Sequence, residues 1–387
     1  MKNIEKLGAL ALNALFGYEP KISRTLIDHL GSAEAVFTLS EQELRDIFGP
    51  YSTKVSRINP EALAHAEKEL DWLESQGLTF ISMTEPEYPK QLLACPDPPV
   101  GLYVRSSTPV AELFPERPFV AVVGTRDISP YGSEWCRRIV GAVAQAPQKP
   151  VIVSGLAIGV DITAHLAALE CGLPTIAVIP TGISDVYPRR HAPTAVRIAS
   201  TPGCALVTDY PPGTTPQPVN FLRRNRIIAG LSQATVLVES KSKGGGTMTA
   251  RLAADYGRDV FALPGRIDDP RSAGCNLLIQ EKIAESISNL ATLPEALGLG
   301  RWHRRRTADL LEEVRERLGS RLSSSELDEV LRLAAAVRKT RGISLEELSE
   351  ELGMSYPAVS VVAGLLESEG FITIDMLQRC AIDVKIS

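Results

Sequence analysis

Phe119-Val120-Ala121-Val122-Val123-Gly124-Thr125-Arg126 is the stretch of sequence that decides the fold. Its five consecutive apolar residues predict a strand that is buried on both faces, because a half-exposed strand would alternate apolar and polar residues. Gly124 then predicts a turn. A strand of this kind belongs in a parallel sheet that is covered by helices on both sides.

Similar apolar runs recur after this stretch and alternate with segments of helical pattern. The expected strands are 119–123, 151–153, 175–179, 205–208, 235–238 and 259–263. The expected helices are 132–146, 160–171, 191–200, 222–230 and 247–256. This alternation predicts an α/β fold with a central, doubly wound parallel sheet. Such a sheet binds its ligand at the carboxyl ends of its strands.

The segments that flank this domain have different patterns. The expected organisation is a helical module at 1–77, a proline-rich bridge at 78–118, the predicted α/β domain at 119–290, a linker with helical segments at 291–340, and a winged-helix-like domain at 341–387. In the last segment Ser344 and Ser355 can each cap a helix, and residues 371–374 can form a strand.

Charge is distributed unevenly along the 387 residues. The formal net charge of −5 disfavours a nucleic-acid partner when it is taken alone. Residues 116–280, however, carry 17 basic and 12 acidic side chains, whereas both flanking segments are net acidic. The positive charge therefore lies in the predicted α/β domain, where its placement decides what it can bind.

The sequence lacks a metal-binding cysteine pattern and lacks a membrane or export segment. The 6 cysteines are far apart and show no metal-ligand spacing, which predicts reduced thiols in a cytoplasm and no metal site. No apolar stretch approaches the roughly 18–20 residues needed to cross a bilayer, and the N-terminus carries no export signal pattern. We expect a cytoplasmic protein with no membrane partner.

Turns rich in hydrogen-bond donors follow the first two predicted strands. Gly124, Thr125, Arg126 and Ser129 follow the first strand, and the small residues from Gly155 to Gly159 follow the second. Glycine lets the backbone approach a ligand, helix-terminal N–H groups attract anions, and arginine and serine add donors suited to phosphate. The alternative is a tight turn whose serine only caps its own helix.

The run from Phe221 to Arg226 is the most informative part of the sequence. Arg223, Arg224, Asn225 and Arg226 provide phosphate donors at the start of a helix, beside an aromatic ring on which a base can stack. Charge and stacking together favour a nucleic-acid strand. The alternative is a solvated basic helix face with one arginine buried in an ion pair.

A third glycine-rich turn, Gly244 to Thr247, opens another predicted helix. It lacks the ending of a Walker A loop, and no dinucleotide fingerprint follows the first strand, so we expect no bound cofactor. A hydrolase would need a positioned carboxylate, for which Asp161 and Glu239 are the candidates. We expect Asp161 to be a helix cap or dipole partner and His165 to be a partly buried, hydrogen-bonded histidine. The sequence therefore predicts a binding pocket with no catalytic residues.

Six blocks of sequence, in order, resemble the DNA-processing protein A family, also called DprA or Smf. The blocks are Gly124-Thr125-Arg126 with Ser129 and Tyr131-Gly132; Ser154-Gly155-Leu156-Ala157 with Gly159 and Asp161; Thr181-Gly182 with Asp185 and Tyr187-Pro188; Phe221 with 224–232; Gly245 through Ala250; and Pro264-Gly265 with Ser272, Gly274 and 276–279. The resemblance is strong over about residues 119–282, whereas the two terminal modules agree with the family in pattern only.

The resemblance implies a helical, SAM-like N-terminal module and an extended Rossmann-like domain that binds single-stranded DNA. It implies a non-enzymatic protein that self-associates as a homodimer. It also implies that the protein protects incoming DNA and helps load the RecA recombinase during natural transformation of competent cells. The residues expected to bind DNA are Gly124, Thr125, Arg126, Ser129, Gly155, Gly159, Phe221, Arg223, Arg224, Asn225, Arg226, Gly245 and Thr247. The chain departs from the family at Gln217–Asn220, where a basic residue is usual, and at Leu222, where proline is frequent; the additional Arg223 can compensate.

Two other functions remain open from the sequence. Rossmann-like nucleotide (phosphoribo)hydrolases with a Gly-Gly-x-Gly-Thr helix opening are similar at Gly244 to Thr247. A dimeric scaffold that recognises its target through the C-terminal winged helix is the other alternative. The second helix expected in that module, Ser355 to Leu366, carries no lysine or arginine, so protein contact or stability is the expected role of the module.

Overall fold

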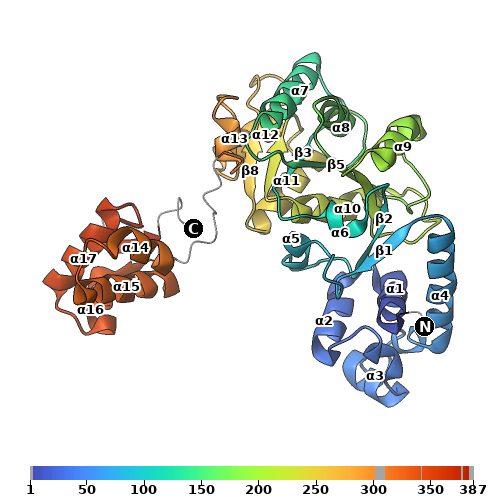
Figure 1. Cartoon of the computed structure of the whole chain (residues 1–387), viewed down its shortest axis with the longest axis horizontal. Helices are drawn as coiled ribbons and strands as arrows, with labels where there is room; N and C mark the ends of the chain where they lie inside the picture. Colours follow the sequence, from blue (N-terminus) through green and yellow to red (C-terminus); the bar gives the residue numbers. More distant parts are fainter. Residues whose placement is uncertain (1–2, 301–309, 341, 376–377, 383–387) are drawn as a thin grey trace. The chain divides into compact units, whose positions relative to one another are not determined.

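The apolar run at 119–123 forms β3 (Phe119–Val123), a fully buried strand near the middle of a large sheet. The computed structural model describes residues 3–300, 310–340, 342–375 and 378–382. The chain divides into two compact units, Met1–Arg301 and Trp302–Ser387 (Figure 1). Each unit is described by itself below.

The described part of the first unit contains one nine-stranded sheet, ordered β1-β2-β6-β5-β4-β3-β7-β8-β9. The strands besides β3 are β1 (Thr79–Ser82), β2 (Gly101–Arg105), β4 (Val151–Ser154), β5 (Thr175–Val178), β6 (Ala205–Thr208), β7 (Ala234–Leu237), β8 (Asp259–Ala262) and β9 (Glu285–Ser286). The neighbours from β6 through β9 are parallel, whereas β2 pairs antiparallel with β6 and β1 antiparallel with β2. The predicted α/β fold is confirmed.

Helices cover both faces of this sheet, and side chains alternate between two cores. The covering helices are α7 (Pro130–Ala144), α8 (Val160–Glu170), α9 (Ala192–Ser200), α10 (Pro218–Leu231), α11 (Gly245–Asp255), α12 (Ala273–Gln280) and α13 (Leu293–Ala296). Val120 and Val122 of β3 pack with α7, α8 and α13, whereas Phe119, Ala121 and Val123 belong to the core that contains α10, α11 and α12. This period of two is what a pleated strand imposes.

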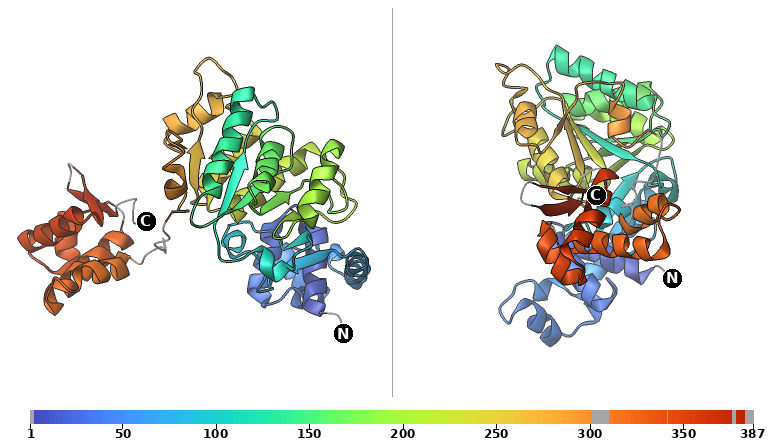
Figure 2. Two further views of the ribbon diagram at one scale, coloured as in Figure 1. Left: turned by 45° about the horizontal axis from the view of Figure 1, so that its top comes forward. Right: turned by 90° about the vertical axis from the view of Figure 1, so that its left-hand side faces the viewer.

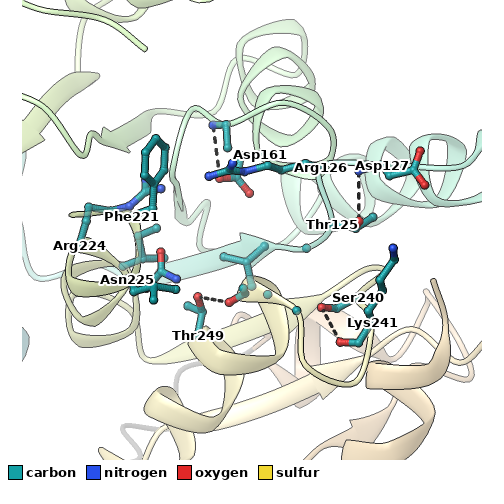
Figure 3. A pocket seen from close by; sticks show the side chains of 18 of the residues that line it. Thr125, Arg126, Asp127, Asp161, Phe221, Arg224, Asn225, Ser240, Lys241 and Thr249 are labelled. Carbon is teal, nitrogen blue, oxygen red and sulfur yellow. Dashed lines mark hydrogen bonds between the residues drawn. The ribbon is translucent and has the colours of Figure 1, made fainter. Parts of the chain in front are cut away.

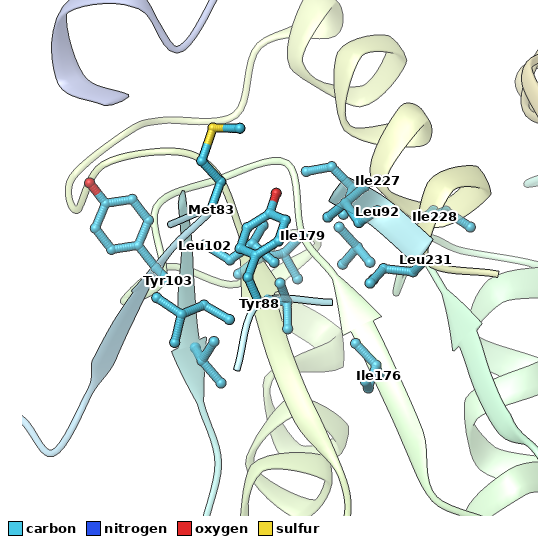
Figure 4. Close-up of a cluster of buried hydrophobic side chains, with 14 of the residues drawn as sticks. Met83, Tyr88, Leu92, Leu102, Tyr103, Ile176, Ile179, Ile227, Ile228 and Leu231 are labelled. Carbon is cyan, nitrogen blue, oxygen red and sulfur yellow. The ribbon is translucent and has the colours of Figure 1, made fainter. Parts of the chain in front are cut away.

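The N-terminal helices pack directly onto the second of these cores. The module contains α1 (Ile4–Phe16), α2 (Pro20–Leu30), α3 (Glu41–Phe48) and α4 (Pro60–Ser75), with short 3-10 turns at Ala35–Thr38 and Val55–Arg57. Buried residues of α1, including Leu10 and Phe16, share one core cluster with Tyr103 of β2 and Ile227 of α10. Figure 4 shows the part of this cluster around Tyr88, Leu92 and Tyr103.

The segment expected to be a bridge, residues 78–118, is instead part of the sheet. It supplies β1 and β2 as well as the short helices α5 (Lys90–Leu93) and α6 (Val110–Leu113). The sequence expectation of a connection was wrong here, because the prolines between and around the two strands indicate turns and no segment of helical sequence pattern separates the strands to suggest the α/β alternation. The sheet therefore begins about forty residues earlier in the chain than the sequence indicated.

The second unit is a helical core with a small antiparallel sheet. Its elements are α14 (Leu310–Leu318), α15 (Ser324–Lys339), β10 (Ile343–Ser344), α16 (Leu345–Leu352), α17 (Tyr356–Ser368), β11 (Ile372–Ile374) and β12 (Arg379–Ile382), with strand order β10-β12-β11. Ser344 caps α16 in a capping box with Glu347, whereas the side chain of Ser355, at the start of α17, makes no cap hydrogen bond.

Much of the predicted linker 291–340 belongs to this C-terminal unit. Leu310, Val314 and Leu333 lie in the same buried cluster as Leu348 and Phe371. Residues 301–309 of that linker lie outside the described residues. Figure 2 shows the two units from two further directions. No helix in the described ranges is both long and apolar enough to span a membrane.

Candidate functional site

The carboxyl ends of β3 and β7 open into a cleft of about 700 Å³. β3 lies between β4 and β7, which is the point where the strand order reverses and where open α/β sheets bind ligands. The lining residues come from five segments: 123–127, Ala157 with Asp161, Tyr187, Pro216 with residues of α10, and 240–249. Figure 3 shows this cleft with its labelled side chains.

The turn after β3 presents one exposed cation to the cleft. Arg126 is exposed and has no hydrogen-bond or ion-pair partner among the described residues. Its guanidinium carbon lies 4.6 Å from the centroid of the Phe221 ring. The Phe221 ring in turn meets the ring of Tyr187 edge-on, with centroids 5.5 Å apart. The cleft therefore carries an arginine with free donors against a pair of aromatic rings.

Ser129 faces away from this cleft and caps α7. Its hydroxyl donates to Glu239 over 2.5 Å and accepts from the backbone N–H of Gly132 over 3.0 Å, while its own N–H donates to the same carboxylate over 2.9 Å. The structure thus favours the alternative that the sequence left open, a serine that caps its own helix. Ser129 is fully engaged, so it is corrected from a phosphate donor to a structural residue.

Arg224 lies beneath the floor of the cleft rather than at its mouth. Only 3% of its surface is exposed, and its guanidinium donates to the carbonyl of Val178. A Cβ on Gly155 would sit 2.1 Å from Nη1 of Arg224, so glycine makes the space that the guanidinium occupies. Burial lowers the pKa of Arg224 to about 10, and the nearby carboxylate of Asp161 partly opposes that shift. The arginine still carries a full positive charge at neutral pH.

Arg226 and Arg223 lie on other sides of α10. Arg226 is 8% exposed, forms an ion pair of 2.5 Å with Asp209 and donates to the carbonyl of Asp97. It is the buried, ion-paired arginine that the sequence allowed as an alternative, and it does not line the cleft. Arg223 points toward the N-terminal module, where its guanidinium carbon lies 4.5 Å from the centroid of the Tyr18 ring.

The loop between β7 and α11 forms the opposite wall of the cleft. Lys241 and the glycines from Gly244 to Gly246 line the cleft on this side. Figure 3 shows the side chain of Lys241 on the other side of the cleft from Arg126. Thr247 does not line the cleft, because its hydroxyl donates to the carbonyl of Lys241 over 2.8 Å and so fixes this loop. Backbone N–H groups at the start of a helix and the lysine ammonium are both suited to anions.

Two glycines predicted to contact the ligand serve to bring backbones together. Gly159 has a φ of +87°, and a Cβ there would lie 2.2 Å from the carbonyl oxygen of Thr125. Gly155 accommodates Arg224, as described above. Both residues shape the turns that surround the cleft without lining it.

The structure thus brings together about half of the residues predicted from the sequence. Those that line the cleft are Gly124, Thr125, Arg126, Phe221, Arg224, Asn225 and Gly245. Those that do not are Ser129, Gly155, Gly159, Arg223, Arg226 and Thr247. Sequence reasoning missed Lys241, Ser240 and Tyr187 as lining residues. Tyr187 stands in one of the six blocks, and a lysine in the loop after a strand, four residues beyond the end of β7, was a usable signal for Lys241.

The two carboxylates considered for a hydrolase are both engaged or enclosed. Glu239 accepts the two hydrogen bonds from Ser129 and is 1% exposed. Burial raises the pKa of Asp161, whose carboxylate accepts a hydrogen bond of 3.4 Å from the N–H of Ala157. Within the described ranges, no group of three histidine, cysteine, aspartate or glutamate side chains is arranged to hold a metal ion.

His165 is fully buried instead of partly buried, at some distance along α8 from the cleft. Its Nδ1 lies 2.7 Å from the hydroxyl of Thr175, and that hydroxyl donates to the carbonyl of Ile152. Nδ1 therefore carries the proton. Burial lowers the pKa of His165 to about 3, which keeps the imidazole neutral.

Comparison with known proteins points in one direction. The family described as DNA recombination-mediator protein A matches residues 79–298, more than half of the chain. Protein Smf of Escherichia coli is 41% identical over 215 residues, a match that spans 56% of either protein. The X-ray structure of DNA processing protein A from Streptococcus pneumoniae aligns with a TM-score of 0.62 at 31% identity, covering 76% of this chain and 98% of that one.

A second solved structure bears on the cleft. It concerns the single-stranded-DNA binding mode of DNA processing protein A from Helicobacter pylori. It aligns with a TM-score of 0.50 at 30% identity and covers 57% of this chain and 95% of that one.

Proposed function

This chain belongs to the DNA recombination-mediator protein A family, and from that premise we propose that it binds single-stranded DNA in the cleft beside β3. The observation that carries the proposal is the placement of Arg126 against the ring of Phe221, because this exposed arginine has no polar partner among the residues that the structure describes. An arginine attracts phosphate, and an aromatic ring accepts a base with little sequence preference. The binding of single-stranded DNA by the Helicobacter relative supports the same assignment.

Four kinds of group bind the strand in this proposal. Arg126 and Lys241 contact phosphates from opposite walls, and Phe221 with Tyr187 stacks a base. Backbone N–H groups at Gly245 add donors at the start of α11. Arg224 acts from below as a fixed positive charge, because its buried guanidinium contacts the carbonyl of Val178.

We propose the wider role from the resemblance to the family. The protein acts in DNA recombination in the cytoplasm, where a homodimer protects single strands that enter during natural transformation and helps load RecA on them. This part of the proposal is tested by sedimentation for the dimer, and by RecA filament formation on strands coated with a single-strand-binding protein. A protein without effect on filament formation would limit the proposal to strand binding.

A competition experiment tests the binding itself. Fluorescence anisotropy with a labelled oligo-dT, competed with unlabelled single strand and with duplex of the same length, should show clear preference for the single strand. The duplex is the control for attraction by charge alone. It carries more phosphates than the single strand but exposes no base faces. Equal competition by the duplex would show that the cleft does not use base stacking and would contradict the proposal.

A further inference from the structure

Tyr18 joins the N-terminal module to the helix that carries the cleft. It lies in the short turn between α1 and α2, next to Gly17. Its hydroxyl donates to Asn220 Oδ1 over 3.2 Å, and its ring lies 6.0 Å from that of Tyr210. Both partners belong to the α/β domain, and Asn220 is in the first turn of α10.

Despite these contacts, Tyr18 remains 48% exposed. The guanidinium of Arg223 lies over its ring at 4.5 Å, and Nη1 of Arg223 is buried without a hydrogen-bond partner in the described structure. Asp209, whose charge acts on Arg223, is already bound to Arg226. A cation and an exposed ring stand together here, and this pair repeats the arrangement of Arg126 and Phe221 in the cleft.

The two arginine–aromatic pairs flank one exposed helix face. Phe221 and Arg223 are two positions apart, so their side chains leave α10 in widely different directions. Between them lies Leu222, which is 46% exposed and also lines the cleft, and one turn earlier lies Val219, which is 44% exposed. An apolar, solvent-accessible surface thus connects the cleft to Tyr18 across the start of α10.

The width of this surface fits a short length of strand. A helix with its side chains is about 10 Å wide, and stacked nucleotides advance about 3.4 Å along a strand. Crossing α10 therefore takes about three nucleotides. The carboxylate beside Tyr18, that of Glu19, is paired with Lys54 over 2.8 Å, so it presents no free charge to repel phosphate.

We propose that the bound strand leaves the cleft across Leu222 and that a base stacks on the Tyr18–Arg223 pair, which makes the N-terminal module part of the single-stranded-DNA site. This inference rests on the proposed function. It extends the site beyond the α/β domain and assigns a ligand to a residue of the helical module. Tyr18 then does two things, because its hydroxyl holds α10 while its ring receives a base.

The test compares Tyr18→Leu and Tyr18→Phe in the full chain with two lengths of oligo-dT. One is the shortest oligo-dT that binds, and the other is about three nucleotides longer. Tyr18→Leu keeps an apolar side chain but removes the stacking surface, so it should weaken binding of the longer strand about tenfold and leave the shorter one unchanged. Tyr18→Phe keeps the ring and should bind as the unaltered protein does.

Arg223→Gln adds an independent readout. It should lower the slope of log affinity against log salt by about 0.7 for the longer strand only. Tyr51→Leu is the matched control, since Tyr51 is a 96% exposed aromatic of the same module in a different place. Ultraviolet cross-linking of an iodouracil-substituted strand should place a cross-link on the peptide that contains Tyr18.

The outcomes separate this inference from the proposed function. If the unaltered protein binds no single strand, the proposed function itself fails. If it binds, and Arg126→Gln weakens binding while Tyr18→Leu changes neither strand and no cross-link forms at Tyr18, only the extended path is wrong. If Tyr18→Leu weakens both strands equally and lowers the melting temperature, Tyr18 is a structural clamp and the inference is overturned.

Discussion

The guanidinium carbon of Arg126 lies 4.6 Å from the centre of the Phe221 ring, although the two residues come from the end of β3 and the start of α10. The ring thereby orients the arginine, and no hydrogen-bond or ion-pair partner in the described part of the chain occupies its donors. A cation over a ring contributes about 0.5–1 kcal/mol at an exposed position, which is enough to orient the side chain and too little to sequester it.

Replacing Arg126 should weaken single-strand binding and flatten its salt dependence. Each phosphate that is no longer neutralised lowers the slope of log affinity against log salt by about 0.7. Arg126→Gln should therefore lose about that much slope, measured by anisotropy titrations at several salt concentrations. Arg137→Gln is the control, because Arg137 is an exposed arginine paired with Glu170 on the surface. An unchanged slope in a folded Arg126→Gln protein would remove Arg126 from the site.

Arg224 should matter for folding more than for contact with the strand. Arg224→Met leaves the carbonyl of Val178 without this donor and removes one of the two arginine charges that act on Asp161. We expect the free energy of unfolding to fall by about 1–3 kcal/mol, measured by urea denaturation. Arg251→Met is the control, since Arg251 pairs with Glu281 at the surface and should change stability little. Full stability in Arg224→Met would contradict the buried contact.

The hydrogen bonds between Ser129 and Glu239 should be a structural unit. Glu239→Gln replaces a charged acceptor that receives two donors at the start of α7, and should cost about 1.5–3 kcal/mol of stability. The measurement is a double-mutant cycle with Ser129→Ala, in which the two losses should be less than additive. Additive losses would mean that the two side chains act independently.

The same carboxylate distinguishes a hydrolase from a binding protein. We expect no release of base when the protein is incubated with nucleoside monophosphates and the mixture is separated by chromatography. Turnover that is present in the unaltered protein and absent in Glu239→Gln would favour the nucleotide hydrolase.

His165 should make stability depend on pH below neutrality. Its pKa is about 3 in the folded protein and about 6.5 in an unfolded chain, so between these values the unfolded state binds the extra proton. Stability should therefore fall as pH falls from 6.5, by about 2 kcal/mol at pH 5 from this group alone. Denaturation curves recorded at pH 5 and at a pH well above 6.5 measure this difference in the free energy of unfolding. In His165→Gln the difference should shrink by that amount, and an identical pH dependence would show that another group is responsible.

Removal of the C-terminal unit should spare the site. Unit 1 ends at Arg301, and the cleft and Tyr18 both lie within it. A protein truncated after residue 301 should bind oligo-dT with an affinity within about twofold of that of the full chain, measured by the same anisotropy titration. A large loss of affinity in a truncated protein that is folded by circular dichroism would assign part of the binding to the winged-helix-like module.

The strands of the parallel sheet and their turns could be read from the sequence because their signals are local. Five apolar residues before Gly124 mark β3, and Gly244 to Gly246 mark the start of α11, without reference to any other part of the chain. The segment that forms β1 and β2 lacked such a signal. Its strands lie among prolines, and their place is set by the antiparallel pairing of β2 with β6 and of β1 with β2.

Sequence alone determined that a positively charged α/β domain carries glycine turns and an arginine-rich helix, because composition and periodicity are properties of neighbouring residues. Only the tertiary structure decided what each arginine of that helix does. Arg223, Arg224 and Arg226 look equivalent in the sequence, yet one lies over Tyr18, one beneath the cleft and one against Asp209. The reason is the rotation of about 100° per residue along a helix, which directs adjacent side chains toward partners that are remote in the chain.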